Sequence, residues 1–316
     1  MSELALEWKN VSFAARQGFW MKLRKIVQDI DISVPPGTVL GLVGPNGAGK
    51  TTTIKLGAGL LHPLSGKVLI KGISAAESKA RKSVGLLTEN QYIYPHLRLR
   101  EWLEMLAGFS GIKGGERMHR VDTVLEAFEL SDLSQQLMHT LSKGQLQRAG
   151  LAQAFVHKPE ILLLDEPMSG LDPYWRYRVQ QILTDFKSSG GTILFSSHIL
   201  MDVERLSDQI VLIKEGRVQW HGCPKDMQRK IKAYEAICRS SSPEALKNIA
   251  EKGSVLPQPA GEWRASIPEN KKEELLQMVS QGKIDLLSLR PIQEEIEEIL
   301  FALIKEPKQG KGSETK

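Results

Sequence analysis

Hydrophobic and polar residues alternate along the first part of the chain in the manner of β-strands. The alternation predicts strands over residues 4–13 and 26–34, because successive side chains of a strand point to opposite faces. The next apolar stretch, residues 38–44, shows no alternation and predicts a strand that is buried on both faces. Short apolar runs at 67–72 and 83–88 predict further strands.

Helical spacing of apolar residues interrupts this pattern twice. A helix is expected from Lys50 until Pro63 and Gly66 break it, and a longer helical region is expected from about Leu97 to Lys158. Strands return over residues 161–167, 192–198 and 209–218, separated by helical segments. Strands that alternate with helices favour a parallel sheet with crossover connections.

The pattern changes again after Gly222. Residues 223–306 predict the order β-α-β-α-β-α, which is typical of a small separate domain. The final segment, residues 307–316, has nothing to bury and is expected to be disordered. The chain is therefore divided into a larger domain over 1–222, with a helical subdomain at about 90–157, and a small α/β domain over 223–306.

Composition narrows the class of protein without identifying it. The chain has 41% hydrophobic and 25% charged residues, values near the average for soluble globular proteins, and no apolar run long enough to span a bilayer. The N-terminal residues lack the basic and apolar regions of a secretory signal. Cys223 and Cys238 form neither a metal-type spacing nor a disulfide framework, which favours a reducing cytoplasm. The net charge of +5 favours an anionic partner surface, either nucleic acid or the inner membrane leaflet.

A phosphate-binding loop is the strongest chemical signal in the chain. The stretch GPNGAGKTT matches G-x-x-x-x-G-K-[ST] and lies between a predicted buried strand and a helix, a context that a chance glycine-rich turn would not share. Its glycines let backbone N–H groups face phosphate oxygens, Lys50 adds a charge near the β- and γ-phosphates, and Thr51 is a candidate Mg²⁺ ligand. The expected nucleotide-binding residues of the loop are Gly44, Pro45, Asn46, Gly47, Ala48, Gly49, Lys50, Thr51 and Thr52.

Two carboxylates and a histidine follow buried strands elsewhere. Asp165 and Glu166 come directly after four apolar residues, so a central parallel strand delivers them to the sheet edge that holds the phosphates. Asp165 is predicted to hold the Mg²⁺ shell, and Glu166, which points the other way, is predicted to polarise the attacking water. His198 ends another buried strand at the same edge and is predicted to contact the γ-phosphate.

A second anion site is predicted at the helix that begins in LSKGQLQRAG. Ser142 is a good N-cap and Gly144 leaves the backbone bare, so this helix N-terminus suits an anion. One nucleotide has one triphosphate, which the first loop already surrounds. The second site is therefore assigned to a nucleotide held by another copy, in a dimer with two-fold symmetry.

With these residues in place, the chain resembles the ATP-binding subunits of ABC (ATP-binding cassette) transporters over about residues 4–222. GPNGAGKTT is similar to the Walker A motif, LSKGQ to the signature, ILLLDEP to Walker B, SGLD to the D-loop, and His198 to the switch histidine. The resemblance implies an α/β P-loop NTPase fold with a mixed or parallel sheet and a helical subdomain, followed by a small α+β domain. It also implies ATP and Mg²⁺ as ligands and a head-to-tail ATP-bound dimer. In that dimer Ser142, Gly144 and Gln145 face the opposite γ-phosphate, and Asp172 links the two sites.

Three positions depart from the family pattern. Lys143 stands where the signature usually has glycine, and a basic residue there still suits an anion. Ala15 stands where an aromatic residue normally stacks on adenine, so Phe13, or Phe19 and Trp20, either substitutes or packs on the first sheet. The usual lid-loop glutamine aligns with Glu89, which is therefore expected at Mg²⁺ and the lytic water; the alternative is that Gln91 fills this role.

Four stretches of the chain resemble those of single-cassette bacterial exporters whose permeases are separate proteins. They are LTENQYIYP, LSKGQLQR, DEPMSGLDP and FSSHILMDVE. This resemblance implies a peripheral subunit on the cytoplasmic face of the plasma membrane and a homodimer or paired cassette. The permease contact is expected between Tyr92 and Trp102, through exposed aromatic and basic residues on the helical lobe. An importer is the nearest alternative. A soluble ABC ATPase acting on ribosomes or DNA is disfavoured by the single cassette and the absence of a heptad run, so no nucleic acid partner is expected. A protein that only senses ATP is disfavoured by Glu166 and His198.

Overall fold

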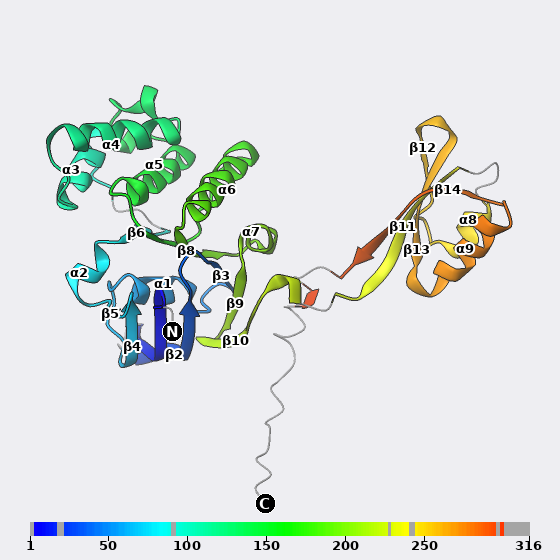
Figure 1. Ribbon diagram of the computed structural model, residues 1–316, viewed down its shortest axis with the longest axis horizontal. Coiled ribbons are helices and arrows are strands. Elements are labelled where there is room, and N and C mark those ends of the chain that lie inside the picture. Colours follow the sequence, from blue (N-terminus) through cyan, green and yellow to red (C-terminus); the bar gives the residue numbers. More distant parts are fainter. Residues whose placement is uncertain are drawn as a thin grey trace, which may run out of the picture. The chain divides into compact units, whose positions relative to one another are not determined.

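The computed structural model describes residues 3–17, 22–89, 93–226, 229–239, 244–294 and 298–299. Contacts divide the chain into two compact units, Met1–Pro224 and Lys225–Lys316 (Figure 1). The expected tail at 307–316 and four residues discussed above, Phe19, Trp20, Gln91 and Tyr92, lie outside the described residues. No helix in the described ranges combines the length and the apolar character that a bilayer crossing requires.

A six-stranded sheet forms the centre of the first unit. Its strand order is β10-β9-β3-β8-β7-β6, and all neighbouring pairs are parallel except β10 with β9. Every residue of β3, β7 and β8 is buried, which explains why β3 and β7 contain no polar side chain, whereas β8 also buries Thr192, Ser196 and Ser197. The strands are β3 (Val39–Val43), β6 (Val84–Leu87), β7 (Ile161–Leu164), β8 (Thr192–Ser197), β9 (Gln209–Lys214) and β10 (Arg217–Gly222).

Two sequence expectations about element ends are wrong. The single strand expected over 209–218 is a hairpin, because Glu215 and Gly216 adopt φ values of 51° and 76° and form a two-residue turn between β9 and β10. The helix that begins at Lys50, α1 (Lys50–Gly57), stops before the expected Pro63. Gly59, at φ 65°, takes the left-handed conformation that commonly ends a helix.

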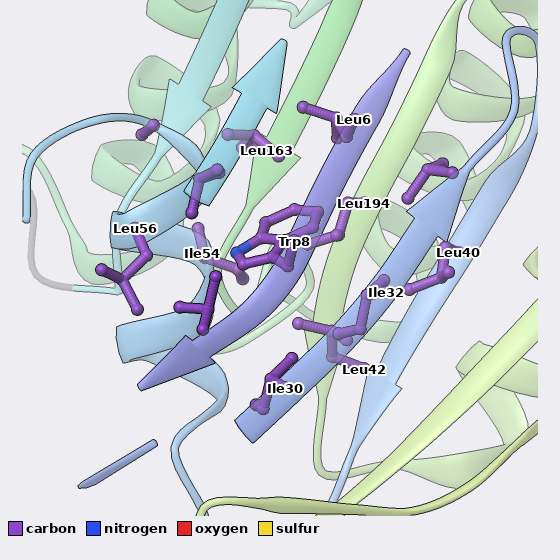
Figure 2. Packing of buried hydrophobic residues seen from close by; sticks show 14 of the residues in the cluster. Leu6, Trp8, Ile30, Ile32, Leu40, Leu42, Ile54, Leu56, Leu163 and Leu194 are labelled. Carbon is purple, nitrogen blue, oxygen red and sulfur yellow. The ribbon is translucent and has the colours of Figure 1, made fainter. Parts of the chain in front are cut away.

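A second sheet, fully antiparallel, packs with α1 and the central sheet around the main core. Its order is β2-β1-β4-β5, with β1 (Leu6–Gln17), β2 (Lys22–Val34), β4 (Ser65–Ile70) and β5 (Ile73–Ser74). Trp8 of β1 is 1% exposed, and Figure 2 shows it among apolar side chains of α1 and both sheets. The labelled neighbours in that view are Leu6, Ile30, Ile32, Leu40, Leu42, Ile54, Leu56, Leu163 and Leu194.

A helical lobe is inserted between β6 and β7. It contains α3 (Leu99–Phe109), α4 (Gly114–Ala127) and α5 (Lys143–Phe155), with two short 3-10 turns, Ser131–Leu133 and Met138–Thr140 (Figure 1). Trp102 is 2% exposed within this lobe, so the expectation of an exposed aromatic at this end of the segment is wrong. Tyr94, near the start of the described part of this segment, remains 55% exposed. Three further helices of the unit are α2 (Ser78–Arg81), α6 (Pro173–Ser188) and α7 (Leu200–Leu206).

The second unit contains an antiparallel sheet with the order β12-β13-β11-β14. The strands are β11 (Ile231–Arg239), β12 (Leu256–Gln258), β13 (Glu262–Pro268) and β14 (Asp285–Gln293), and the helices are α8 (Glu244–Ile249) and α9 (Lys272–Ser280). Apolar residues of three strands and both helices form its own core, which includes Ala236, Ile267 and Leu275. Antiparallel pairing with helices makes this unit α+β.

Candidate functional site

The phosphate loop joins β3 to α1 at the carboxyl edge of the central sheet. Glycine is required at Gly44, where a Cβ atom would lie 2.1 Å from the carbonyl oxygen of Ile213, and at Gly49, where φ is 110°. No side chain caps α1, and its first turn contains no acidic residue. The N-terminal amides of α1 are therefore available to an anion, and the positive end of the helix dipole faces the loop.

Lys50 folds back over the loop. Its side chain is largely buried, and its Nζ donates hydrogen bonds to the carbonyl oxygens of Gly44 at 2.7 Å and Pro45 at 3.3 Å. Burial lowers the pKa of Lys50, and the nearby charges of Glu166, Asp165 and Glu89 oppose that shift. Three carboxylates therefore act on this one ammonium group, which places Glu89 within the electrostatic reach of the phosphate loop.

A cavity of about 900 Å³ opens over the loop. Glu89, Glu166 and His198 line it together with the loop residues from Pro45 to Thr52. Sequence reasoning missed three basic residues of the wall, which are Arg24, Lys25 and Lys214. The only sequence signal for the first two was the basic character of the segment that precedes residue 26.

Asp165 lies behind this cavity at the end of β7. It is 1% exposed, and the hydroxyl of Ser196 on β8 donates a 2.6 Å hydrogen bond to its Oδ1. The same hydroxyl accepts a 3.0 Å hydrogen bond from the backbone N–H of Glu166. The Oδ2 of Asp165 is buried, and no hydrogen-bond partner for it is found among the described residues. Sequence reasoning missed Ser196, because only the pairing of β7 with β8 brings it to Asp165.

The candidate ligands fit a magnesium ion. An unpartnered buried carboxylate oxygen, the hydroxyl of Thr51 and the carboxylate of Glu89 are hard oxygen donors, which Mg²⁺ prefers. The part of the chain that the structure describes contains no group of three or more His, Cys, Asp and Glu residues suited to a metal. Mg²⁺ is usually held by one or two carboxylates and by substrate phosphates.

Glu166 and His198 contact each other at the cavity wall. Their side chains approach with 2.7 Å between Nδ1 of His198 and Oε2 of Glu166. Glu166 has a φ of 51°, a left-handed conformation that costs free energy for a residue with a side chain and often marks a functional position. Gln147 of α5 stabilises this turn, since its Nε2 donates to the carbonyl oxygens of Glu166 and Pro167, each at 3.0 Å.

The signature residues are separate from this cavity. Ser142 caps α5: its Oγ accepts from the N–H of Gln145 at 3.3 Å, and its own N–H donates to the Oε1 of Gln145 at 2.8 Å. Gly144 is next to Gly170, and the Lys143 side chain passes over the same glycine. None of these residues lines the cavity.

Asp172 also has a local structural role and does not line the cavity. Its Oδ1 accepts a 2.9 Å hydrogen bond from the N–H of Trp175 and caps α6. The expected action of Asp172 and of the signature residues on a second copy stays a prediction.

The aromatic residue expected at adenine is not among the described cavity residues. Phe13 packs against the main core, so of the two alternatives for this residue the packing role holds. Ala15 does not line the cavity either. Glu89 does line it, whereas the alternative residue Gln91 lies outside the described residues, so the lid role of Glu89 stays a prediction.

Comparison with known protein sequences identifies the family. Residues 27–169 match the family described as ABC transporter. An uncharacterized ABC transporter ATP-binding protein of Nostoc sp. is 37% identical over 258 residues, which cover 81% of this chain and 76% of the relative. The linearmycin resistance ATP-binding protein of Bacillus subtilis is 34% identical over 206 residues, which cover 65% of this chain and 66% of the relative.

Solved structures agree with this result. The ATP-binding subunit of an ABC transporter superposes with a TM-score of 0.63 at 31% identity, covering 70% of this chain and 91% of that structure. A dimeric ATP-binding cassette in a post-hydrolysis state, bound to ADP and Pi, superposes with a TM-score of 0.64 at 25% identity, covering 69% and 98%. The predicted P-loop NTPase fold and ATPase activity are confirmed. The chain belongs to the ABC transporter ATP-binding proteins and is an ABC ATPase that binds ATP.

Proposed function

We propose that this chain is the ATP-hydrolysing subunit of an ABC exporter and acts with a separate integral membrane permease at the cytoplasmic face of the plasma membrane. The observation that carries the hydrolytic part is the contact between Glu166 and His198 in the cavity that the phosphate loop also lines. A base, its partner and a phosphate cradle in one cavity are what hydrolysis of a terminal phosphate requires.

Within this proposal each side chain has a defined task. The amides of the loop and Lys50 bind the triphosphate, and Thr51, Asp165 and Glu89 hold Mg²⁺. The ion neutralises charge on the phosphate oxygens when it is bound. Glu166 accepts the proton of the water that attacks the γ-phosphorus, while the bond from that phosphorus to the β-phosphate oxygen breaks and ADP leaves. His198 fixes the carboxylate of Glu166 and contacts the γ-phosphate.

We also propose that two copies act head to tail. The signature helix α5 begins with the exposed Ser142 and Lys143 and has no acidic residue in its first turn. A cation at the positive end of a helix is unfavourable by itself and becomes favourable when an anion binds there. The first cavity does not include this helix end, so a phosphate of the second copy is the proposed anion, and Asp172 lies at the same interface.

The permease contact is assigned to the segment that follows the lid loop. Tyr94, Pro95, His96 and Arg98 are exposed there, a few residues after Glu89 in the chain. A segment so placed can report the state of the γ-phosphate to a membrane partner. Export in particular is supported by the motif details and by a relative whose name records linearmycin resistance.

Isolation of the tagged chain from membranes of its own cell tests this proposal. We expect a multi-helix membrane protein to accompany it, and we expect Tyr94→Ala with Arg98→Glu to lose that protein while keeping basal ATPase activity. Tyr177→Ala is the matched control, because Tyr177 is 58% exposed against 55% for Tyr94 but lies on α6. Uptake of the permease substrate into inside-out vesicles indicates export, and uptake only into right-side-out vesicles indicates an importer. Co-isolation with ribosomes or DNA and with no membrane protein would contradict the proposal.

A further inference from the structure

Asp202 is a buried carboxylate in the first turn of α7, the helix that follows His198. It is 5% exposed, and both of its oxygens have partners on α6. Arg176 donates from Nη2 to Oδ2 at 2.6 Å, and Gln180 donates from Nε2 to Oδ1 at 3.0 Å. A buried carboxylate that loses such partners is costly, so this pairing fixes α7 against α6.

Gln180 connects the same cluster to the segment that carries the catalytic base. Its Nε2 also lies 3.7 Å from the Sδ of Met168, which is two residues after Glu166 and is buried. The contacts therefore close a ring. Backbone connects Glu166 to Met168, and Gln180 contacts both Met168 and Asp202. Backbone then connects Asp202 to His198. The 2.7 Å contact between His198 and Glu166 completes it.

The ring restricts the backbone conformation between the end of β8 and the start of α7. His198 lies between the end of β8 at Ser197 and the start of α7 at Leu200, so few backbone torsions separate it from the anchored helix. Its side chain is 55% exposed, whereas that of Glu166 is 13% exposed. Packing alone does not hold an imidazole that is this exposed, and the anchored helix limits where the ring can lie.

We propose that Asp202 is a positioning residue for hydrolysis, which binds Arg176 and Gln180 and thereby holds His198 against Glu166. The inference rests on the proposed function, since it takes Glu166 as the base. Through Asp202, helix α6, which Asp172 caps, would also influence the position of His198. A second copy that contacts Asp172 would act on His198 through the same helix.

The kinetic test compares Asp202→Ala with a matched control. We expect Asp202→Ala to lower kcat at least tenfold with KM for ATP within threefold, and Asp202→Glu, which keeps the carboxylate, to recover kcat to within threefold of wild type. Lys187→Met is the control: Lys187 also lies on α6 and donates to Asp208 at 2.6 Å, but away from the ring. Its kcat should stay within twofold. A loss of kcat in Lys187→Met equal to that in Asp202→Ala would overturn the proposal.

A second measurement does not depend on turnover. Ring resonances of His198, assigned by comparison with His198→Gln, are recorded by NMR at a temperature where all variants are folded by circular dichroism. Asp202→Ala should shift them and Lys187→Met should leave them unchanged. Unshifted resonances in Asp202→Ala would overturn the positioning role, even if hydrolysis falls. A wild-type chain with no ATPase activity would refute the proposed function, while the NMR result would still decide the role of Asp202.

Discussion

The hydroxyl of Ser196 joins the two acidic residues of the site, because it donates to the Oδ1 of Asp165 at 2.6 Å and accepts from the N–H of Glu166 at 3.0 Å. Ser196 is fully buried, so no water can replace its hydroxyl without rearrangement. This one group orients the candidate metal ligand and stabilises the left-handed turn at the candidate base. Partners of this kind orient a metal ligand, and their loss typically costs about 10- to 100-fold in metal affinity or activity.

Ser196→Ala should therefore weaken both metal binding and the fold. Loss of the bond to Asp165 should raise the Mg²⁺ concentration for half-maximal hydrolysis by about 10- to 100-fold. Two buried groups are left without a partner, and each should lower the free energy of unfolding by about 1–3 kcal/mol. Ser197→Ala is the control, because Ser197 is also buried but, among the described residues, its hydroxyl bonds only to the backbone of Ile199. An equal shift of the Mg²⁺ midpoint in both variants would contradict the role assigned to Ser196.

Glu166→Gln should abolish turnover while leaving ATP binding intact. The amide keeps the shape of the side chain but cannot accept the proton of water, so we expect a fall in kcat of about 10²- to 10⁴-fold. Size-exclusion chromatography with ATP should show a stable dimer, since the phosphate cradle and the partner's signature helix remain. Glu160→Gln, at the other end of β7 and paired with Lys71, should behave as wild type. Near-normal turnover in Glu166→Gln would remove Glu166 as the base.

Activity should be shared between two copies. Lys50→Ala removes the cation of one phosphate loop, and Ser142→Arg removes the cap of α5 at a cost of about 1 kcal/mol and blocks the helix end. Each variant alone should be inactive. Their mixture should recover up to one functional site per heterodimer, because the intact loop of one copy faces the intact signature of the other. No recovery, once heterodimers are demonstrated by differential tags, would mean that the signature does not act across an interface.

Glu89 should make nucleotide binding depend on divalent metal. Its carboxylate lines the phosphate cavity, where we expect it to ligate Mg²⁺ favourably and to face bare phosphate unfavourably. Glu89→Gln should keep ATPase activity within about tenfold, or about 1.4 kcal/mol of barrier, and should flatten the metal dependence. ATP titrations with and without Mg²⁺ measure this in wild type, Glu89→Gln and Gln91→Ala. Unchanged metal dependence in Glu89→Gln, together with crippled hydrolysis in Gln91→Ala, would assign the lid role to Gln91.

Acid should destabilise the chain through His157. Burial lowers the pKa of this histidine, a backbone hydrogen bond to Val84 opposes the shift, and Arg120 adds to it. The unfolded chain therefore binds the proton first, and stability is lost as the pH falls below about 6.5. His157→Gln should reduce this loss in urea titrations between pH 7 and pH 5, whereas His119→Gln, at an exposed position on α4, should not. Equal slopes in wild type and His157→Gln would exclude His157 as the source.

The sequence by itself determined the parts of the site that are local in the chain. The spacing of GPNGAGKTT sets a loop between a buried strand and a helix, and the apolar run before Asp165 sets a central parallel strand. Both follow from short-range rules, because backbone conformation at glycine and burial of consecutive apolar residues need no knowledge of distant contacts. The position of Glu89 in the cavity also followed from its distance to a recognisable Tyr-Pro pair.

The tertiary structure alone decided which side chains support these residues. Ser196 bonds to Asp165, 31 residues away in the sequence, and Asp202 bonds to Arg176, 26 residues away. No local sequence pattern predicts either pair. The burial of Trp102 and the packing of Phe13 depended in the same way on neighbours from other elements. Hydrophobic periodicity predicts that a residue faces the interior of the protein. Which residue it contacts there depends on how the strands and helices pair, and that pairing is a property of the assembled fold.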